Sequence, residues 1–506
     1  MHRSLYDAFC HTASEHAGRT AWLCPQIHWA PSIQWCEARQ SVDRLALWLQ
    51  KNHIQTADRI VNLEPNSHRW AILDLACSAI GAIHSPIDPR WNNQHVLAAL
   101  QSLEPRIIFT SASSKLPHTK TISIADALDQ ATDTPSKLQT ENWQAQLRWD
   151  QTANILWTSG TTADPKGVML SHANLLSNAM AKLDAMPQNA QDVRLNLLPF
   201  AHAYARTCEL TTWYLSGGSI ACVATSPELL KATSVVRPTL INAVPSVFEF
   251  LLRNFEANYP HASLGSMLGG RIRQLASGGA AIDPKIRTRF TSESMPIYQG
   301  YGLTEASPVV CSNRAPRIQN GQNIEAIVQG VGSPVLNVQY RMDDQDRLWV
   351  KGPGVMQGYW RNEQATDEKI KDGWLDTGDC ASEVHDNSTT LHIAGRADEV
   401  QVLSTGHKFA PCILEQTIAK LDGIADCVVV GTGLRRPLVI VQLKDSYPAD
   451  DLAVLEQIHR GLGPQPDYLQ VAQVVFADEP WTVENGLRHW KGGINRREII
   501  RRLTPK

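Results

Sequence analysis

The sequence predicts an α/β protein with a large N-terminal domain of α/β subdomains and a smaller C-terminal α/β domain. Apolar runs of strand length alternate with amphipathic helical segments over most of the chain, which favours a largely parallel sheet. From residue 391 the expected elements become shorter, and they are numerous enough for a small domain of their own. The 506 residues are sufficient for about three folding units.

The apolar pattern places individual elements. Residues 41–50 put Val42, Leu45 and Leu49 on one face of a helix. Short apolar stretches predict strands at 60–63, 105–110, 219–223 and 238–244. In the C-terminal part we expect helices at 413–421 and 451–462 and strands at 426–431, 438–443 and 472–478.

Composition excludes several functional classes. A net charge of −3 and a hydrophobic fraction of 43% indicate neither a nucleic-acid partner nor a disordered chain. The first ten residues lack a basic segment followed by an apolar one, and no run of about 20 uncharged apolar residues occurs. We therefore expect a cytoplasmic protein without a transmembrane segment.

Residues 154–175 contain the most informative pattern. Residues 155–157 predict a buried strand, and the next five combine hydroxyls and backbone N–H groups with little side-chain bulk: Thr158, Ser159, Gly160, Thr161 and Thr162. Pro165 stiffens the exit and Lys166 adds a positive charge, so the segment predicts a phosphate-binding loop. It is not a Walker A loop, because the lysine follows a proline. A polar hairpin is the alternative.

Further motifs follow in the chain. They are YQGYGLTEASPVV from Tyr298, GWLDTGD from Gly373, GRADEV from Gly395 and STGHKFAP from Ser404. Together with TSGTTADPKG from Thr158, and in this order, they resemble the adenylate-forming superfamily, which contains acyl-CoA synthetases, luciferase and the adenylation domains of peptide synthetases. The resemblance extends from about Arg59 almost to the C-terminus. It implies an AMP-binding domain over 1–395, a hinge at 396–398 and a small mobile domain over 399–506.

The resemblance also assigns nucleotide-binding residues. The loop from Thr158 to Lys166 would bind the β- and γ-phosphates of ATP. Tyr301 would stack on adenine, Thr304 would donate to the α-phosphate, and Glu305 would bind Mg²⁺, for which carboxylate oxygen is a suitable ligand. Without the other motifs, these residues are more typical of a glycine-containing turn capped by Thr304 and Glu305.

Further nucleotide contacts are implied downstream and upstream of this turn. Asp379 would accept hydrogen bonds from the ribose hydroxyls, and Arg396 would be directed at the same sugar. Gly278, Gly279 and Ala280 would line the adenine and acyl sites, because glycine permits close approach of the backbone to a ligand. The alternatives are a solvated turn at Asp379 and a plain strand-to-helix turn before Pro284.

The acyl side of the site is implied by LLPFAHAYAR, which begins at Leu197. It resembles the family's acyl-pocket motif, with His202 near the reacting carboxylate; a structural histidine is the alternative. Amino-acid-activating relatives place an aspartate in this motif to pair the substrate ammonium, and this chain has none, which disfavours amino acids. Gly406 in STGHKFAP would leave room for the thiol arm of CoA.

One departure from the family pattern concerns the C-terminal lysine. In similar long-chain synthetases a lysine stands eight positions after the asparagine of ENGL, and counting from Asn485 gives Gly493. Lys491 lies two residues earlier, a shift of roughly 6.6 Å that keeps a side chain on the same face of an extended segment. We expect Lys491 to replace the missing lysine.

The sequence therefore predicts an acid–thiol ligase, most similar to long-chain fatty acyl-CoA synthetases. A carboxylic acid and ATP would give acyl-AMP and pyrophosphate, and CoA would then displace AMP. One rival transfers the acyl group to an acyl carrier protein or another nucleophile; no carrier domain is expected after Lys506, which favours CoA. The other rival is a nucleotide-binding pseudoenzyme, because lysine is missing at position 493.

Overall fold

The computed structural model describes residues 2–24, 32–111, 120–132, 147–158, 165–259, 262–319, 322–324, 328, 330–385, 389–397, 400–444, 447–482, 484–488 and 494–503. By its internal contacts the chain divides into two compact units. The first comprises Met1–Arg341, Trp349–Thr377 and Glu383–Leu391; the second comprises Met342–Leu348, Gly378–Ser382 and His392–Lys506. This division does not test the hinge predicted at 396–398, and Asp398, one of its three residues, lies outside the described residues.

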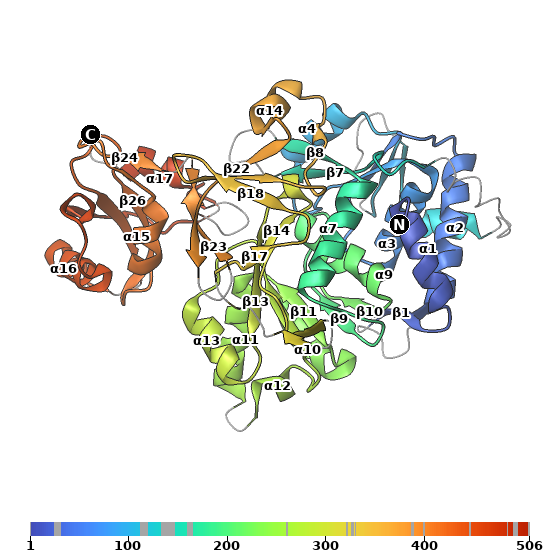
Figure 1. Ribbon diagram of the computed structural model, residues 1–506, viewed down its shortest axis with the longest axis horizontal. Coiled ribbons are helices and arrows are strands. Elements are labelled where there is room, and N and C mark those ends of the chain that lie inside the picture. Colours follow the sequence, from blue (N-terminus) through green and yellow to red (C-terminus); the bar gives the residue numbers. More distant parts are fainter. Residues whose placement is uncertain are drawn as a thin grey trace. The chain divides into compact units, whose positions relative to one another are not determined.

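In the described part of the first unit, nine strands form one sheet (Figure 1). The central strands run parallel, and β2, β14 and β17 pair antiparallel at the two edges. In sheet order the strands are β17 (Ser333–Pro334), β14 (Val309–Ser312), β13 (Ile297–Gly302), β12 (Gln274–Ser277), β11 (Leu240–Ala243), β9 (Val193–Asn196), β10 (Ser219–Cys222), β1 (Thr20–Leu23) and β2 (Ile33–Gln34). The strands expected at 219–223 and 238–244 are confirmed.

A second sheet of the same unit has seven described strands. Its order is β20 (Gly358–Tyr359), β8 (Lys166–Ser171), β7 (Thr152–Thr158), β4 (Ile83–Pro86), β3 (Arg59–Asn62), β5 (Ile107–Phe109) and β6 (Lys120–Ile122). Strands β7, β4, β3, β5 and β6 are parallel. Strand β8 pairs antiparallel with β7, and the edge strand β20 pairs antiparallel with β8. The strands expected at 60–63, 105–110 and 155–157 lie here, so the largely parallel α/β prediction holds for both sheets.

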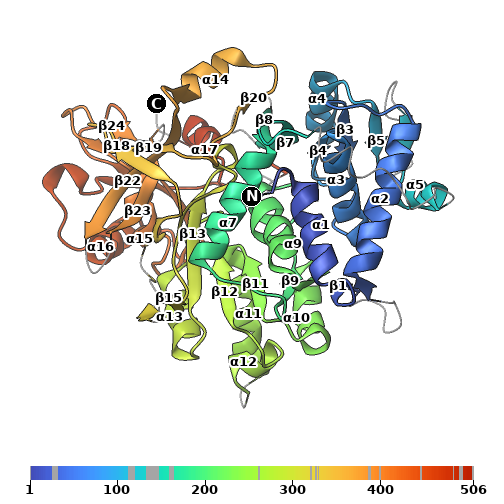
Figure 2. The same cartoon turned by 45° about the vertical axis from the view of Figure 1, so that its right-hand side comes forward.

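Helices cover the sheets of the first unit. Their bounds are α1 (Leu5–Glu15), α2 (Trp35–Lys51), α3 (His68–Ile80), α4 (Asn93–Leu103), α5 (Ile124–Ala131), α7 (His172–Ala185), α9 (Thr212–Ser216), α10 (Ser226–Val236), α11 (Pro245–Asn258), α12 (Leu264–Met267), α13 (Pro284–Ser292) and α14 (Glu363–Lys369). Figure 2 shows α1, α2 and α3 side by side. Val42, Leu45 and Leu49 are fully buried on α2, as the helical pattern predicts.

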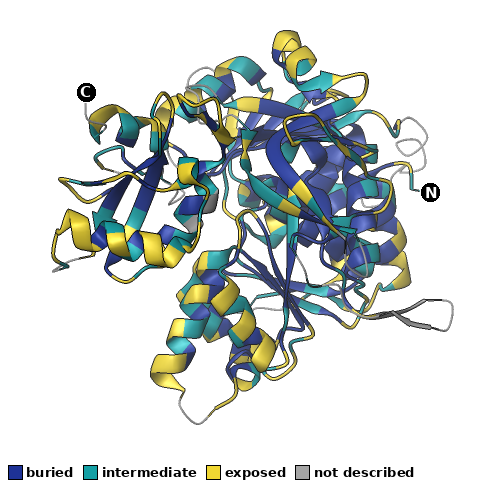
Figure 3. Ribbon diagram, turned by 60° about the vertical axis from the view of Figure 1, so that its left-hand side comes forward, coloured by how far each residue is buried: buried dark blue, intermediate teal, exposed yellow. Residues whose placement is uncertain are grey.

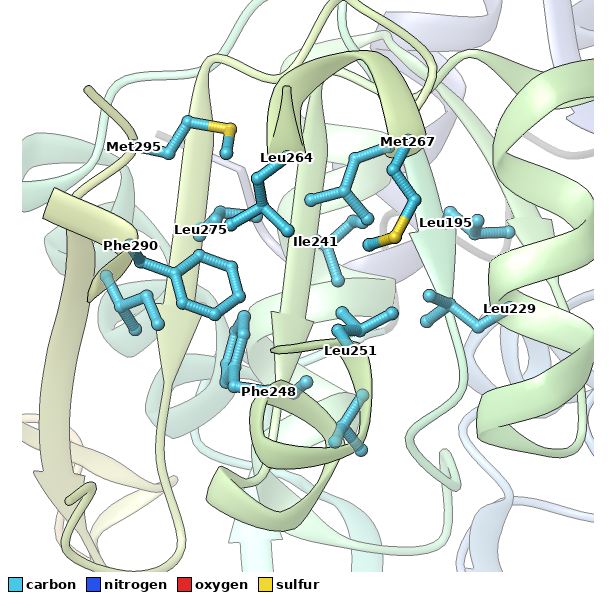
Figure 4. Close-up of a cluster of buried hydrophobic side chains, with 14 of the residues drawn as sticks. Leu195, Leu229, Ile241, Phe248, Leu251, Leu264, Met267, Leu275, Phe290 and Met295 are labelled. Carbon is cyan, nitrogen blue, oxygen red and sulfur yellow. The ribbon is translucent and has the colours of Figure 1, made fainter. Parts of the chain in front are cut away.

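A large cluster of buried apolar side chains lies beneath α10 to α13. Phe248 of α11 and Phe290 of α13 meet edge to face with ring centroids 5.6 Å apart, and they belong to the same cluster as the strand residues Leu275 and Ile241 (Figure 4). Figure 3 shows the result: buried strands and helices with exposed outer faces. Burial of this kind fixes the ends of the strands, from which the candidate site residues extend.

The second unit contains a three-stranded sheet of β26 (Ile424–Val430), β27 (Leu438–Leu443) and β28 (Gln473–Phe476), with the helices α15 (Pro411–Ile418), α16 (Asp451–Leu462) and α17 (Arg496–Leu503). A short hairpin joins β24 (Gln401–Val402) to β25 (Lys408–Phe409). The strand predicted at 438–443 and the helix predicted at 451–462 match the structure residue for residue. Strands β18 (Gln339–Met342), β19 (Arg347–Lys351), β22 (Trp374–His385) and β23 (Thr389–Arg396) contribute residues to both units, while β21 (Ile370–Lys371) pairs with β22 inside the first.

Among the described residues, no helix is long and apolar enough to cross a membrane.

Candidate active site

The candidate residues of the first unit follow the carboxyl ends of parallel strands. Strand β7 ends at Thr158, β12 at Ser277 and β13 at Gly302, while Asp88 follows β4 and His202 follows β9. In α/β sheets, ligands bind at this end of the strands because side chains and loops from several strands converge there. The sheet topology therefore gathers residues that are far apart in the sequence.

The predicted phosphate loop joins β7 to β8. Thr158 pairs with Lys166 across the hairpin, and its Oγ1 donates to the Lys166 carbonyl at 3.4 Å. Gly167 must be glycine, because a Cβ atom there would lie 2.8 Å from Ile155 and 3.3 Å from Trp157. Four of the predicted loop residues lie outside the described residues: Ser159, Gly160, Thr161 and Thr162.

Tyr359 of β20 links Lys166 to Glu305. The Lys166 Nζ atom lies 5.2 Å from the centroid of the Tyr359 ring, a cation–π contact. On the other side, the Tyr359 hydroxyl donates to Glu305 Oε1 at 2.7 Å in a buried hydrogen bond. The predicted phosphate-binding cation and the predicted metal-binding carboxylate thus contact the same side chain.

Glu305 lies in a tight turn after β13, in a 3-10 helix over Thr304–Ala306. Asn178 of α7 holds this turn: its Nδ2 donates to the carbonyls of Ala306 at 3.2 Å and Val309 at 2.8 Å, and its Oδ1 accepts from the Val309 N–H at 3.0 Å. Tyr301 precedes the turn in β13, opposite Cys311 of β14. These buried amide contacts restrict the turn that carries Thr304 and Glu305.

The glycine loop after β12 approaches Tyr204 of the predicted acyl-pocket motif. A Cβ atom at the buried Gly278 would lie 3.0 Å from the ring of Tyr204, so the tyrosine packs directly on the backbone. Gly279 has a φ of 81°, which favours glycine. Gly279 and Ala280 are exposed. The expected helix start is also present, with Asp283 capping α13 ahead of Pro284.

His202 is oriented by a buried carboxylate. Its Nε2 lies 3.0 Å from Asp88 Oδ2, and the Asp88 side chain is 1% exposed, whereas that of His202 is 27% exposed. Arg90 donates to both oxygens of Asp88, through Nε at 2.9 Å and Nη2 at 2.6 Å. Burial alone would raise the pKa of Asp88, but the hydrogen bonds from Arg90 and His202 outweigh it and hold the pKa well below its usual range.

Arg206, four residues after His202 in the chain, belongs to a buried ionic network. Arg206, in a π-helix over Arg206–Thr211, donates to Asp74 Oδ2 at 2.7 Å and to Asn154 Oδ1 at 3.2 Å. Asp74 Oδ1 also contacts Asn154 Nδ2 at 3.0 Å and His84 Nδ1 at 2.8 Å. The segment after His202 consists of the three-residue helix α8 (Ala203–Ala205) and the π-helix. The network connects this segment to β7, the strand that ends at Thr158.

The second unit contains the remaining candidates. Arg396 Nη1 lies 3.3 Å from Asp379 Oδ1, with the carboxylate largely buried and the guanidinium about half exposed. Gly406 is exposed at a φ of 83° in the turn between β24 and β25. Lys491 and Gly493 lie outside the described residues, so the structure does not test the displaced lysine.

Two contacts were not expected from the sequence: Tyr359 to Glu305, and Asp74 to Arg206. Tyr359 lies outside every quoted motif, so no local pattern marks it. Asp74 does leave a signal, since it is a single carboxylate in the apolar run WAILDLACSAI, and an unpaired charge in such a run would be costly.

A magnesium–nucleotide complex fits the donors that are present. No group of three or more His, Cys, Asp or Glu side chains that could hold a metal occurs in the described part of the chain. A lone carboxylate such as Glu305 suits Mg²⁺, because this ion commonly keeps several waters and binds one or two carboxylates together with substrate phosphates.

Comparison with known proteins finds CoA ligases among the related sequences. The long-chain-fatty-acid–CoA ligase FadD15 of Mycobacterium bovis is 29% identical over 458 residues, which covers 78% of this chain and 74% of that protein. Feruloyl-CoA synthase of an Amycolatopsis species is 26% identical over 427 residues, covering 80% of this chain and 81% of that protein. The solved structure of O-succinylbenzoate coenzyme A synthetase (MenE) from Bacillus subtilis with AMP covers 97% of both chains, with a TM-score of 0.79 at 19% identity.

This structural likeness confirms the predicted adenylate-forming fold. The AMP-binding enzyme family matches residues 9–360, and the AMP-binding enzyme C-terminal domain matches residues 398–462. Because the first match alone spans more than half of the chain, the protein belongs to the AMP-binding enzyme family.

Proposed function

We propose that the protein is an AMP-forming acid–thiol ligase that activates a carboxylic acid of the fatty-acid class and transfers the acyl group to CoA. The observation that carries the proposal is the contact of Lys166 and Glu305 with the same tyrosine, Tyr359. A cation and a metal-binding carboxylate at the carboxyl ends of parallel strands suit a triphosphate with its Mg²⁺. The related CoA ligases support the same reaction class.

In the first half-reaction, a carboxylate oxygen of the acid attacks the α-phosphorus of ATP and pyrophosphate leaves. An anion attacks an anionic centre, so the residues act mainly by neutralising charge and by positioning. Lys166 and the N–H groups and hydroxyls from Thr158 onward would bind the β- and γ-phosphates. Thr304 would donate to the α-phosphate, and Glu305 would hold Mg²⁺, which supplies further neutralising charge.

Other residues would orient the two substrates. Tyr301 would stack on adenine, and Asp379 with Arg396 would bind the ribose. Gly278, Gly279 and Ala280 would line the adenine and acyl sites. His202, held by Asp88, would lie near the acid's carboxylate.

In the second half-reaction, the CoA thiol attacks the acyl carbonyl of acyl-AMP and AMP leaves. We infer a rotation of the small domain 399–506 about the hinge at 396–398 between the two steps, after which the turn at Gly406 would border the pantetheine arm. The exposed, side-chain-free Gly406 is compatible with this role. The cytoplasmic location expected from the sequence remains a prediction.

Two alternatives give different products. In one, an acyl carrier protein replaces CoA as the acceptor. In the other, the chain binds nucleotide without turnover, which the missing lysine at position 493 would explain. Among acids, the absence of an aspartate in LLPFAHAYAR disfavours amino acids.

A screen of pyrophosphate release distinguishes these alternatives. The protein is incubated with ATP, Mg²⁺ and each of a panel of fatty, aryl and amino acids, with and without CoA. We expect release with fatty acids and formation of acyl-CoA only when CoA is present. Pyrophosphate release without acyl-CoA would favour another acceptor. No release with any acid, at nucleotide concentrations that saturate binding, would overturn the ligase assignment.

A further inference from the structure

The contact between Lys166 and Tyr359 is dictated by strand pairing. Strand β20 pairs antiparallel with β8, with Tyr359 opposite Val168, and the Trp360 N–H donates to the Gly167 carbonyl at 2.7 Å. Side chains two residues apart on a strand share one face, so Lys166 and Val168 face the same side as Tyr359. The diagonal position brings the lysine over the tyrosine ring.

The same segment also fixes Glu305. The Met356 N–H donates to the Glu305 carbonyl at 2.8 Å, and the Tyr359 hydroxyl donates to the Glu305 carboxylate. Tyr359 is 5% exposed and Glu305 is 9% exposed, so this hydrogen bond is shielded from water and strong. The Tyr359 N–H is itself held by Thr366 Oγ1 at 2.9 Å.

Tyr6 also contacts one carboxylate and one cation, but there the two charged groups bind each other. The Tyr6 hydroxyl donates to Asp43 at 2.6 Å, and the Arg39 guanidinium lies 5.2 Å from the Tyr6 ring. There the cation also reaches the carboxylate, because Arg39 Nε donates to both Asp43 oxygens at 2.9 Å. The charges at Tyr6 therefore neutralise each other.

At Tyr359 the charges stay separate. In the part of the chain that the structure describes, Lys166 and Glu305 form no ion pair with each other. The ring holds the ammonium by its face, while the hydroxyl holds the carboxylate at its edge. Both charges therefore remain available to a ligand that carries phosphates and a metal ion.

We propose that Tyr359 is a positioning residue that keeps Lys166 and Glu305 apart and oriented for the phosphates and the Mg²⁺ of MgATP. The inference rests on the proposed function. The Tyr359 hydroxyl would orient the Glu305 carboxylate for Mg²⁺. The Tyr359 ring would orient the Lys166 ammonium for the phosphates. The two roles can be separated by substitution.

The test is calorimetric titration of the full-length protein with ATP, once with Mg²⁺ and once with EDTA. Tyr359→Phe keeps the ring and removes the hydroxyl, so it should weaken binding about tenfold with Mg²⁺ and less than about twofold with EDTA. Tyr359→Leu removes both groups and should weaken binding in both buffers. Tyr6→Phe and Tyr6→Leu are matched controls, which should lower thermal stability and leave the Mg²⁺ dependence of binding unchanged.

Equal Mg²⁺ dependence in wild type and Tyr359→Phe would overturn the positioning role, as would the same change in the Tyr6 variants. The outcome is independent of turnover, because binding is measured without acid or CoA. If the Tyr359 pattern appears while no acid releases pyrophosphate, the ligase proposal fails and the positioning role stands. If wild type binds ATP identically in both buffers, the assigned role of Glu305 and the positioning role both fail.

Discussion

Arg206 and Asp74 form an ion pair of 2.7 Å in which both side chains are fully buried. It connects the π-helix that follows His202 to α3, and Asn154 extends it to strand β7, which ends at Thr158. Burial alone would raise the pKa of Asp74, but the attraction of Arg206 and hydrogen bonds from His84 and Asn154 lower it to about 2.

Asp74→Asn should destabilise the protein by about 3–5 kcal/mol, because it leaves the Arg206 charge buried without the negative charge that balances it. Urea unfolding measures the loss. The double variant Asp74→Leu/Arg206→Met removes both charges and should lose much less. A larger loss in the double variant would show that packing, not charge, dominates here.

The same pair predicts an acid-sensitive stability. The folded pKa of Asp74 lies below its ordinary value of 3.8, so its contribution is present above about pH 4 and is lost as the pH falls toward 2. The wild-type advantage over Asp74→Asn should shrink across this interval. An advantage that stays constant from pH 5 to pH 2 would contradict the ion pair.

Glu209 of the π-helix predicts the opposite pH dependence. Burial raises its pKa to about 7, against the attraction of Arg194, a hydrogen bond with Asn242 and the attraction of Lys182. The folded state therefore holds a proton that the unfolded state releases near pH 4.5, and stability falls as the pH rises from about 4.5 to 7.

Glu209→Gln should therefore stabilise the protein at pH 8, on the order of 1–3 kcal/mol, and change little near pH 5. Thermal unfolding of wild type and variant at both pH values measures the difference. Equal effects of the substitution at pH 5 and pH 8 would exclude a buried titrating carboxyl group.

His202→Ala should impair use of the carboxylic acid more than binding of ATP. If His202 lies near the reacting carboxylate, kcat/KM for the acid should fall about tenfold or more, while the KM for ATP changes little. Asp88→Asn, which removes the anionic partner of His202 Nε2, should shift the same constant in the same direction. A selective rise in the KM for ATP would place His202 elsewhere.

Lys491→Ala tests the displaced lysine with two assays. If Lys491 stabilises the charge developing in adenylation, pyrophosphate release from ATP and acid should fall by about a hundredfold or more. Acyl-CoA formation from synthetic acyl-AMP and CoA should persist, because the adenylation step is bypassed. Unchanged pyrophosphate release would show that Lys491 is no surrogate for the lysine missing at position 493.

Sequence reasoning worked best where the signal is local. Strand 438–443 and helix 451–462 follow from side-chain periods within a single segment, and the structure reproduces both. The antiparallel strands β8 and β14, each second from the edge of its sheet, carry no such signal, because strand direction depends on pairing with distant neighbours. The sequence pattern accordingly predicts parallel sheets but not their edges.

The candidate site shows the same limit. Motif positions such as Lys166, Glu305 and His202 are readable along the chain, but the side chains that hold them are not. Glu305 and Tyr359 are 54 residues apart, and Asp74 and Arg206 are 132 apart. Only the strand pairing and the helix packing bring these partners together.

The packing at Gly167 has an optical consequence. This glycine is next to Lys166 in the chain. It packs against the indole of Trp157 and against the side chain of Trp360. Any shift of the lysine backbone when a nucleotide arrives changes the surroundings of these two fluorophores. We therefore expect nucleotide binding to change the tryptophan emission of the protein, a signal that needs no added dye.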